Sequence, residues 1–209
     1  MIPEVSTKVR KLTPAEVNDL HQELDDNSGL WMQHPMNKTV LAEGETIIIN
    51  WVTKINSYYQ LQWTFRKKFP STWKLIESMA NGDEIGKVYW VCVPPGVDVS
   101  PHVDSNNPYI RDGNACNRYQ IYLDIPKEVD LVFDGLKTPI DDTSLMENAL
   151  YDFAANKVHA VYNKSDRPFY ALVFDVLNPG VVIYNDLYCI NETNNSGINR
   201  LTHDTRIDS

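Results

Sequence analysis

Residues 157–177 read KVHAVYNKSDRPFYALVFDVL, and this stretch decides the fold class. Two runs rich in valine, tyrosine and phenylalanine, 157–163 and 169–177, flank the polar letters NKSD. β-Branched and aromatic residues bounded by Asn, Asp and Pro are typical of strands joined by a turn. We therefore predict two consecutive strands here, with no helix between them.

Similar apolar runs recur elsewhere in the chain. They lie at residues 46–51, 87–93, 118–125, 130–133 and 181–184. Because several of these runs follow one another without a helical pattern between them, an antiparallel barrel or jelly roll is favoured over a βαβ sheet. The segment 134–150 is expected to be an excursion between strands. The fold class predicted from the residues is therefore mainly β.

Helical patterns are confined to the N-terminal third. Residues 13–25, TPAEVNDLHQELD, open with Thr13 as a natural N-cap and Glu16 three positions later, which is a capping box. A second helix is predicted over 71–81, with Gly82 placed to end it. We expect these helices to buttress one sheet.

The length of 209 residues predicts one domain. We assign residues 1–190 to it, with a helical and β N-terminal support at 1–85 and a core that carries the metal site at 86–185. Residues 191–209 are polar and are expected to form a surface tail.

Composition excludes several classes of protein. The net charge of −9 argues against a nucleic-acid-binding module, which normally presents a basic surface. No apolar run approaches the length that spans a membrane. The three cysteines form no CxxC pair and indicate free thiols in a reducing compartment. With no signal-peptide pattern at the N-terminus, a cytoplasmic location is expected.

A candidate metal site begins in SPHVD, residues 100–104. His102 and Asp104 are two apart, and in an extended chain both side chains point to one face. His159, in the run KVHAVYN, is the best third ligand. Two histidines and one carboxylate form the facial triad of non-haem iron(II) oxygenases. Each residue also has a structural interpretation: His159 as a half-buried strand histidine, and Asp104 as the cap of a turn.

Arg167 follows His159 across the NKSD turn. If the two flanking strands pair as a hairpin, Arg167 and His159 face the same barrel interior. A guanidinium there would bind a carboxylate with both of its outer nitrogens. The alternative is that Arg167 starts its strand at the solvent edge.

Three ordered blocks carry a resemblance to a known family. They are VCVPPGVDVSPHVDS, NRYQIYLDIP and KVHAVYNKSDRPFYALVFDV, within roughly residues 86–178. Together they resemble the aspartyl/asparaginyl β-hydroxylases, which are iron(II)- and 2-oxoglutarate-dependent oxygenases. The resemblance implies a double-stranded β-helix (a cupin-like jelly roll), with Fe(II), 2-oxoglutarate and O₂ as the cofactor and cosubstrates.

The resemblance also implies roles for single residues. His102, Asp104 and His159 would be the catalytic iron ligands. Arg167 would bind the distal carboxylate of 2-oxoglutarate, while Arg118 and Gln120 would lie near the other end of that cosubstrate. Asn163 would orient the turn. Well-known animal members of the family lack a carboxylate at the position of Asp104, so this chain departs from them by offering a full triad.

The function expected from these features is hydroxylation of an amino-acid side chain of Asp, Asn or Pro type, in a peptide or a free amino acid. Two alternatives stay open: a metal-dependent isomerase or hydrolase on the same barrel, and a binding module without chemistry. Neither nucleic acid nor membrane is expected as a partner. The prime substrate and the oligomeric state are not predicted.

Overall fold

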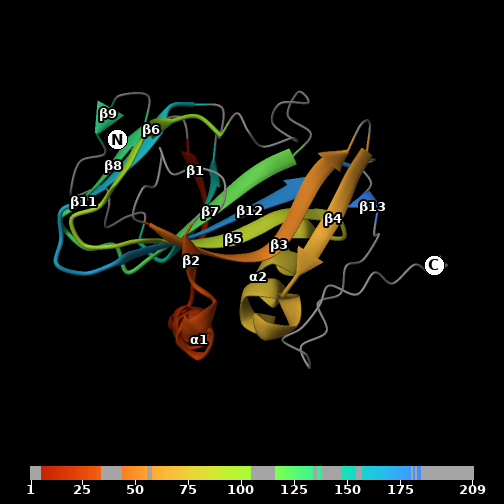
Figure 1. The fold of residues 1–209 in the computed structure, drawn as a ribbon, viewed down its shortest axis with the longest axis horizontal. Helices are drawn as coiled ribbons and strands as arrows, with labels where there is room; N and C mark the ends of the chain where they lie inside the picture. The colour runs from red at the N-terminus through yellow and green to blue at the C-terminus, as the bar shows by residue number, and fades with distance from the viewer. Residues whose placement is uncertain are drawn as a thin grey trace.

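In the computed structural model of the chain, the structure describes residues 6–33, 44–55, 58–104, 116–133, 136–137, 147–153, 157–179, 181 and 183–184. These residues form two β-sheets with helices on one side (Figure 1). The polar segment 191–209 lies outside the described residues.

Counted over the described residues, the larger sheet has nine strands. Eight of them run in the order β1-β10-β7-β12-β5-β3-β4-β13, and β2 pairs with β3 outside this path. Their bounds are β1 Ser6–Lys11, β2 Met32–Gln33, β3 Glu45–Ile55, β4 Tyr58–Thr64, β5 Ile85–Val93, β7 Cys116–Leu123, β10 Ala149–Phe153, β12 Phe169–Leu177 and β13 Ile183–Tyr184. The pairings are antiparallel, except for the parallel pair of β13 with β4.

The smaller sheet has four strands in the order β6-β11-β8-β9. Their bounds are β6 Asp98–His102, β8 Val129–Phe133, β9 Leu136–Lys137 and β11 His159–Asn163. From β5 to β12 the chain crosses repeatedly between the two sheets, and buried side chains such as Val93, Leu131 and Phe169 pack between them. This is the predicted double-stranded β-helix, or jelly roll, and the fold class is confirmed.

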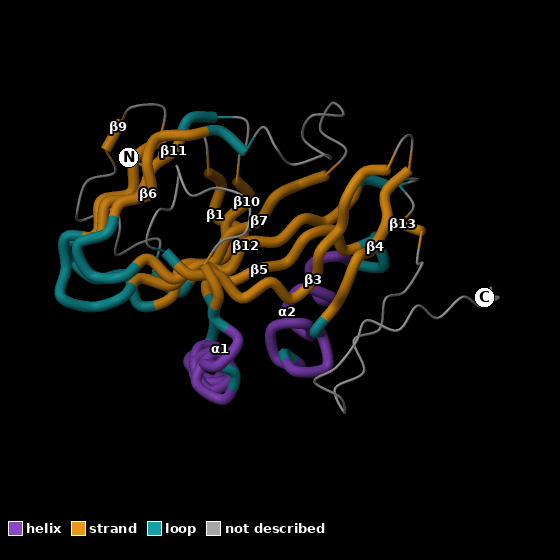
Figure 2. The backbone as a smooth tube through the Cα atoms, viewed as in Figure 1, coloured by secondary structure: helices purple, strands orange, loops and turns teal. Residues whose placement is uncertain are grey.

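The helices lie together beside the larger sheet (Figure 2). They are α1 Pro14–Asp26 and α2 Pro70–Ala80, with short 3₁₀ turns at Ser28–Leu30 and Arg66–Lys68. Their apolar residues, among them Leu20, Leu24 and Ile76, join the core cluster formed by the outer face of the sheet. No helix among the described residues is long and apolar enough to cross a membrane.

The start of α1 and the end of α2 are both set by residues close to them in the sequence. The predicted capping box is present, since Thr13 Oγ1 accepts from the Glu16 amide and the Glu16 carboxylate accepts from the Thr13 amide. At the end of α2, Asn81 takes the left-handed conformation with φ 50°, one residue before the predicted stop at Gly82. The helices buttress one sheet as the sequence predicted.

One prediction about strands was wrong, and one condition that the sequence left open was not met. Segment 134–150 is not only an excursion, because it contains β9 and the start of β10, and β10 is an internal strand of the larger sheet. The two strands of the opening stretch do not pair as a hairpin. β11 bonds to β6 and β8, whereas β12 bonds to β5 and β7. The turn between them therefore carries the chain from one sheet to the other.

Candidate metal centre

Three side chains converge where the smaller sheet ends. His102 is the last residue of β6, Asp104 follows two positions later, and His159 is the first residue of β11. The two histidines are directly opposite each other in the antiparallel pair of β6 with β11. One ligand atom from each of the three residues lies within 4.8 Å of the others. The cluster that the sequence predicted is therefore assembled.

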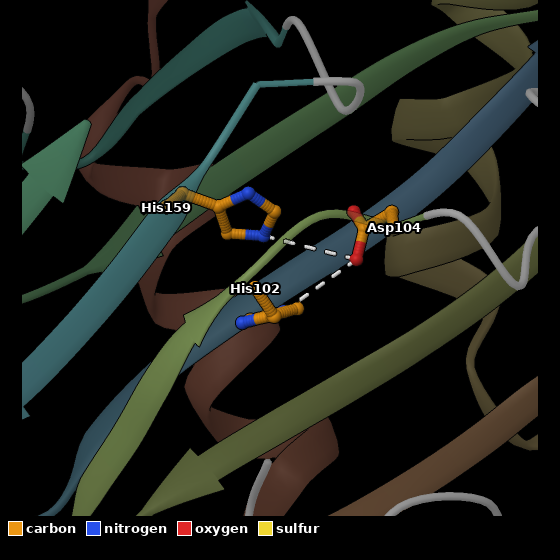
Figure 3. Close-up of side chains that lie close together, drawn as sticks. All are labelled: His102, Asp104 and His159. Carbon is orange, nitrogen blue, oxygen red and sulfur yellow. Dashed lines mark ion pairs between the residues drawn. The ribbon is translucent and has the colours of Figure 1, made fainter. Parts of the chain in front are cut away.

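The ligand atoms point toward one another (Figure 3). Asp104 Oδ1 lies 3.6 Å from His102 Nε2 and 3.7 Å from His159 Nε2. Each histidine places Nδ1 against a backbone carbonyl two residues earlier, at 2.8 Å for His102 and 2.9 Å for His159. When Nδ1 donates to that carbonyl, Nε2 is left with the lone pair that a metal ion needs.

Arg118 anchors the carboxylate from behind. Its Nη1 donates to Asp104 Oδ2 at 2.6 Å, while Nε and Nη2 donate to Asp175 at 2.8 Å and 3.0 Å. Arg118 is only 4% exposed and Asp175 is fully buried. Because Arg118 takes Oδ2, the other oxygen of Asp104 is the one turned to the histidines.

The charges of this network set the pKa directions of the ligands. Burial would raise the pKa of Asp104, but the Arg118 guanidinium and the nearby histidines hold it well below its usual range. Burial lowers the pKa of His159, and the charge of Asp104 does not make up for it. Burial also lowers the pKa of His102, but its hydrogen bonds to Asp104 and Ser100 outweigh burial and leave the pKa raised. Asp104 is therefore an ionised ligand.

The donor set fits a first-row divalent metal. Two neutral imidazoles and one carboxylate on one side of an ion are the ligands of non-haem iron(II) sites, and they leave other positions open. The carboxylate and histidines are largely shielded, with 16% of the Asp104 side chain and 11% of the His159 side chain exposed. His102, Asp104 and His159 are the residues that would hold the ion.

Three other predicted residues are placed less simply. Arg118 donates to Asp104 and Asp175, so its contacts suit anchoring of Asp104 better than binding of cosubstrate. Gln120 is buried, and its side-chain oxygen accepts from the Tyr122 hydroxyl. Arg167 is exposed and lies in the turn that follows β11. His159 is at the opposite end of that strand. The roles of these residues toward 2-oxoglutarate stay predictions.

Asn163 organises that turn. Its Nδ2 donates to the carbonyls of Val93, Pro94 and Arg167, and its Oδ1 accepts from the amide and hydroxyl of Ser165. Asn163 itself is fully buried. One side chain therefore ties the turn after β11 to the end of β5, in line with the orienting role that the sequence predicted.

Asp175 and Lys87 were not predicted. Lys87 lies on β5 and is 7% exposed, and its charge interacts with those of Asp175, Arg118 and Asp104. The available signal was a single charged residue within or beside an apolar strand run, FYALVFDVL for Asp175 and KVYWVCV for Lys87. Charged side chains in such positions are seldom buried without a partner.

The fold and the three ligands define this chain as a jelly-roll protein with a 2-His-1-carboxylate candidate metal centre. More particularly, it belongs to the aspartyl/asparaginyl β-hydroxylase family, whose sequence model matches residues 14–179. The resemblance found in the sequence is thereby confirmed, and the chain is a hydroxylase by family. No curated protein sequence matches it.

Solved structures with a similar fold include two hydroxylases. One is a prolyl hydroxylase from Trichoplax adhaerens in complex with a hypoxia-inducible-factor peptide fragment, with 14% identity, 84% of each chain covered and a TM-score of 0.56. The other is a prolyl-4-hydroxylase from Pseudomonas putida, with 14% identity, a TM-score of 0.52, and coverage of 85% of this chain and 95% of that one. These similarities support the fold.

Proposed function

We propose that this protein is an iron(II)- and 2-oxoglutarate-dependent dioxygenase that hydroxylates an amino-acid side chain. The observation that carries the proposal is the convergence of His102 Nε2, His159 Nε2 and one oxygen of Asp104 within the jelly roll. Family membership supports the reaction class.

The residues of the chain prepare the centre in three ways. His102 and His159 offer lone pairs because backbone carbonyls hold their other nitrogens. Arg118 fixes the angle and the ionised state of Asp104. The apolar cluster between the sheets, which includes Val93, limits the access of water. Bound iron(II) would supply the oxidation itself, with 2-oxoglutarate and O₂ as cosubstrates and succinate and CO₂ as coproducts.

For the substrate, we propose a side chain presented by a peptide or by a free amino acid. The Trichoplax structure is a complex with a peptide fragment, and this supports a peptide as the first substrate class to test. Within the described residues, the ligand cluster keeps partial exposure at His102, of which 21% of the side chain is accessible. A reacting group can therefore approach from that side.

The proposal is tested by mass spectrometry with ¹⁸O₂. The protein is incubated with iron(II), 2-oxoglutarate and a panel of peptides and amino acids, and both succinate and labelled product are measured. We expect succinate and the incorporation of labelled oxygen into one class of substrate. His159→Ala should abolish both signals, while His21→Ala, which lies on α1 away from the cluster, should retain them. A metal-loaded protein that forms no succinate across the panel would refute the proposal.

A further inference from the structure

Lys87 carries a buried amine and lies near Arg118, the residue that anchors Asp104 of the metal centre. β12 pairs with both β7 and β5, and Asp175 lies directly across from Arg118 on β7. On its other side, Asp175 faces the irregular register between Val88 and Ile85 of β5, where Lys87 lies. The three strands thus place Arg118, Asp175 and Lys87 side by side.

The Lys87 ammonium forms no ion pair with a carboxylate of the described residues. Its Nζ lies 4.3 Å from the centroid of the Trp51 ring, and the part of the chain that the structure describes gives it no hydrogen bond or ion pair. Asp175 is already engaged by two nitrogens of Arg118. Among the described groups, the direct contact of this buried ammonium is therefore an aromatic face, and Asp175 and Asp104 act on it only from a greater distance.

A cation–π contact does not suffice to hold such a charge. It offsets only part of the free energy that removing an ammonium from water costs. In line with this imbalance, burial lowers the pKa of Lys87 to about 8, although Asp175 and Asp104 act in the opposite direction. A position of this kind is stabilised once an anion arrives.

The net charge of these buried residues also favours an anionic ligand. The positive charges of Arg118 and Lys87 match the negative charges of Asp104 and Asp175, and the sum is zero. A divalent ion on the triad would add two positive charges to this partly buried region. A ligand with two carboxylates would restore neutrality, and of the two cations Lys87 is the one whose nitrogen donates to no described protein group.

We propose that Lys87, held against Trp51, binds a carboxylate of a ligand bound at the metal centre. This inference rests on the proposed function and names a residue for it. The carboxylate belongs either to 2-oxoglutarate or to an acidic amino-acid substrate. The ammonium offers it three hydrogen-bond donors as well as a charge.

The region next to Arg167 lacks the same features. Arg167 is exposed and is solvated without any ligand. The strand that follows begins with Phe169, which is 1% exposed and stacks on Tyr122 with ring centroids 5.7 Å apart. Arg167 therefore lies in solvent, whereas Lys87 is the buried cation.

The test is isothermal titration of the manganese(II)-loaded protein with two probes, 2-oxoglutarate and aspartate, under anaerobic conditions. Lys87→Met removes the charge at nearly constant length, Lys87→Arg keeps it, and Lys74→Met, at an exposed lysine of α2, is the matched control. For one of the two probes, Lys87→Met should weaken binding by roughly 30- to 3,000-fold, because one member of a buried charge pair is lost. Lys87→Arg should retain much of the affinity, and Lys74→Met all of it.

The outcomes separate this inference from the proposed function. A loss for 2-oxoglutarate assigns Lys87 to the cosubstrate, and a loss for aspartate alone assigns it to the substrate. If the wild type binds aspartate but not 2-oxoglutarate, and Lys87→Met weakens aspartate, Lys87 keeps its role while the proposed cosubstrate fails. If Lys87→Met weakens neither probe, the inference is overturned, whatever the fate of the proposed function. Circular dichroism and metal affinity, both expected to stay unchanged, exclude a folding defect.

Discussion

Replacing Lys87 by methionine should stabilise the ligand-free protein at neutral pH. Burial lowers the pKa of Lys87 from 10.5 to about 8, so the folded protein holds the charged form less readily than the unfolded chain does. Below pH 8 the amine is protonated in both states, and the folded state carries the full cost of the buried charge. At 1.36 kcal/mol per pKa unit this cost is about 3 kcal/mol.

Part of that gain is lost with the contact to Trp51, which is worth up to about 2 kcal/mol. The net increase in the free energy of unfolding of Lys87→Met is therefore expected at about 1–3 kcal/mol near pH 7. As the pH rises through 8, the wild-type amine deprotonates in the folded state only. The unfolded chain then binds more protons, the wild type gains stability, and the difference between the two proteins shrinks toward pH 10.5.

Urea unfolding followed by circular dichroism, in the presence of a metal chelator, measures this difference at pH 7 and at pH 9.5. Both proteins are compared at each pH, so that the titration of other groups cancels. A carboxylate ligand on the metal-loaded protein should reverse the order, because it stabilises the wild type more strongly than the variant. A Lys87→Met protein that is less stable than the wild type by the same amount at both pH values would refute the argument.

Three further predictions concern residues with defined contacts. His159→Ala should reduce iron(II) affinity at least tenfold in a competition titration, whereas His21→Ala should leave it unchanged. Asn163→Ala should lower the free energy of unfolding by about 2–4 kcal/mol, since several buried hydrogen bonds are lost together; a change below 0.5 kcal/mol would contradict this. Glu23→Gln should cost about 1–3 kcal/mol, because the Glu23 carboxylate accepts from the Ser71 and Thr72 amides at the start of α2. Denaturant unfolding measures both, and Glu77→Gln on the exposed face of α2 is the control for Glu23.

The ligands could be predicted from the sequence because their chemistry is local. His102 and Asp104 are two apart at the end of one strand, and His159 lies in a second apolar run. The predicted helix at 13–25 was equally local, since its capping box is set by residues three apart. Strand runs with high β-propensity, such as the one at 169–177, were found for the same reason.

Pairing between strands could not be predicted in this way. The turn after β11 looks like a hairpin turn in sequence, but Asn163 fastens it to β5 through contacts that are far away along the chain. β6 reads DVSPH and has little apolar character, so its sequence carries no strand signal. Lys87 and Asp175 are visible as charges in apolar runs, but only the sheet order shows that they share a row with Arg118.

The shared use of Arg118 has a consequence for the order in which the protein matures. Arg118 on β7 holds Asp104 in position while it is itself hydrogen-bonded to Asp175 on β12. This arrangement requires that β7 and β12 of the larger sheet have already paired. The histidines, in turn, meet only when β6 and β11 have paired. A nascent chain therefore lacks the assembled set of metal-binding side chains. Acquisition of the metal becomes a late event that reports on the completed barrel.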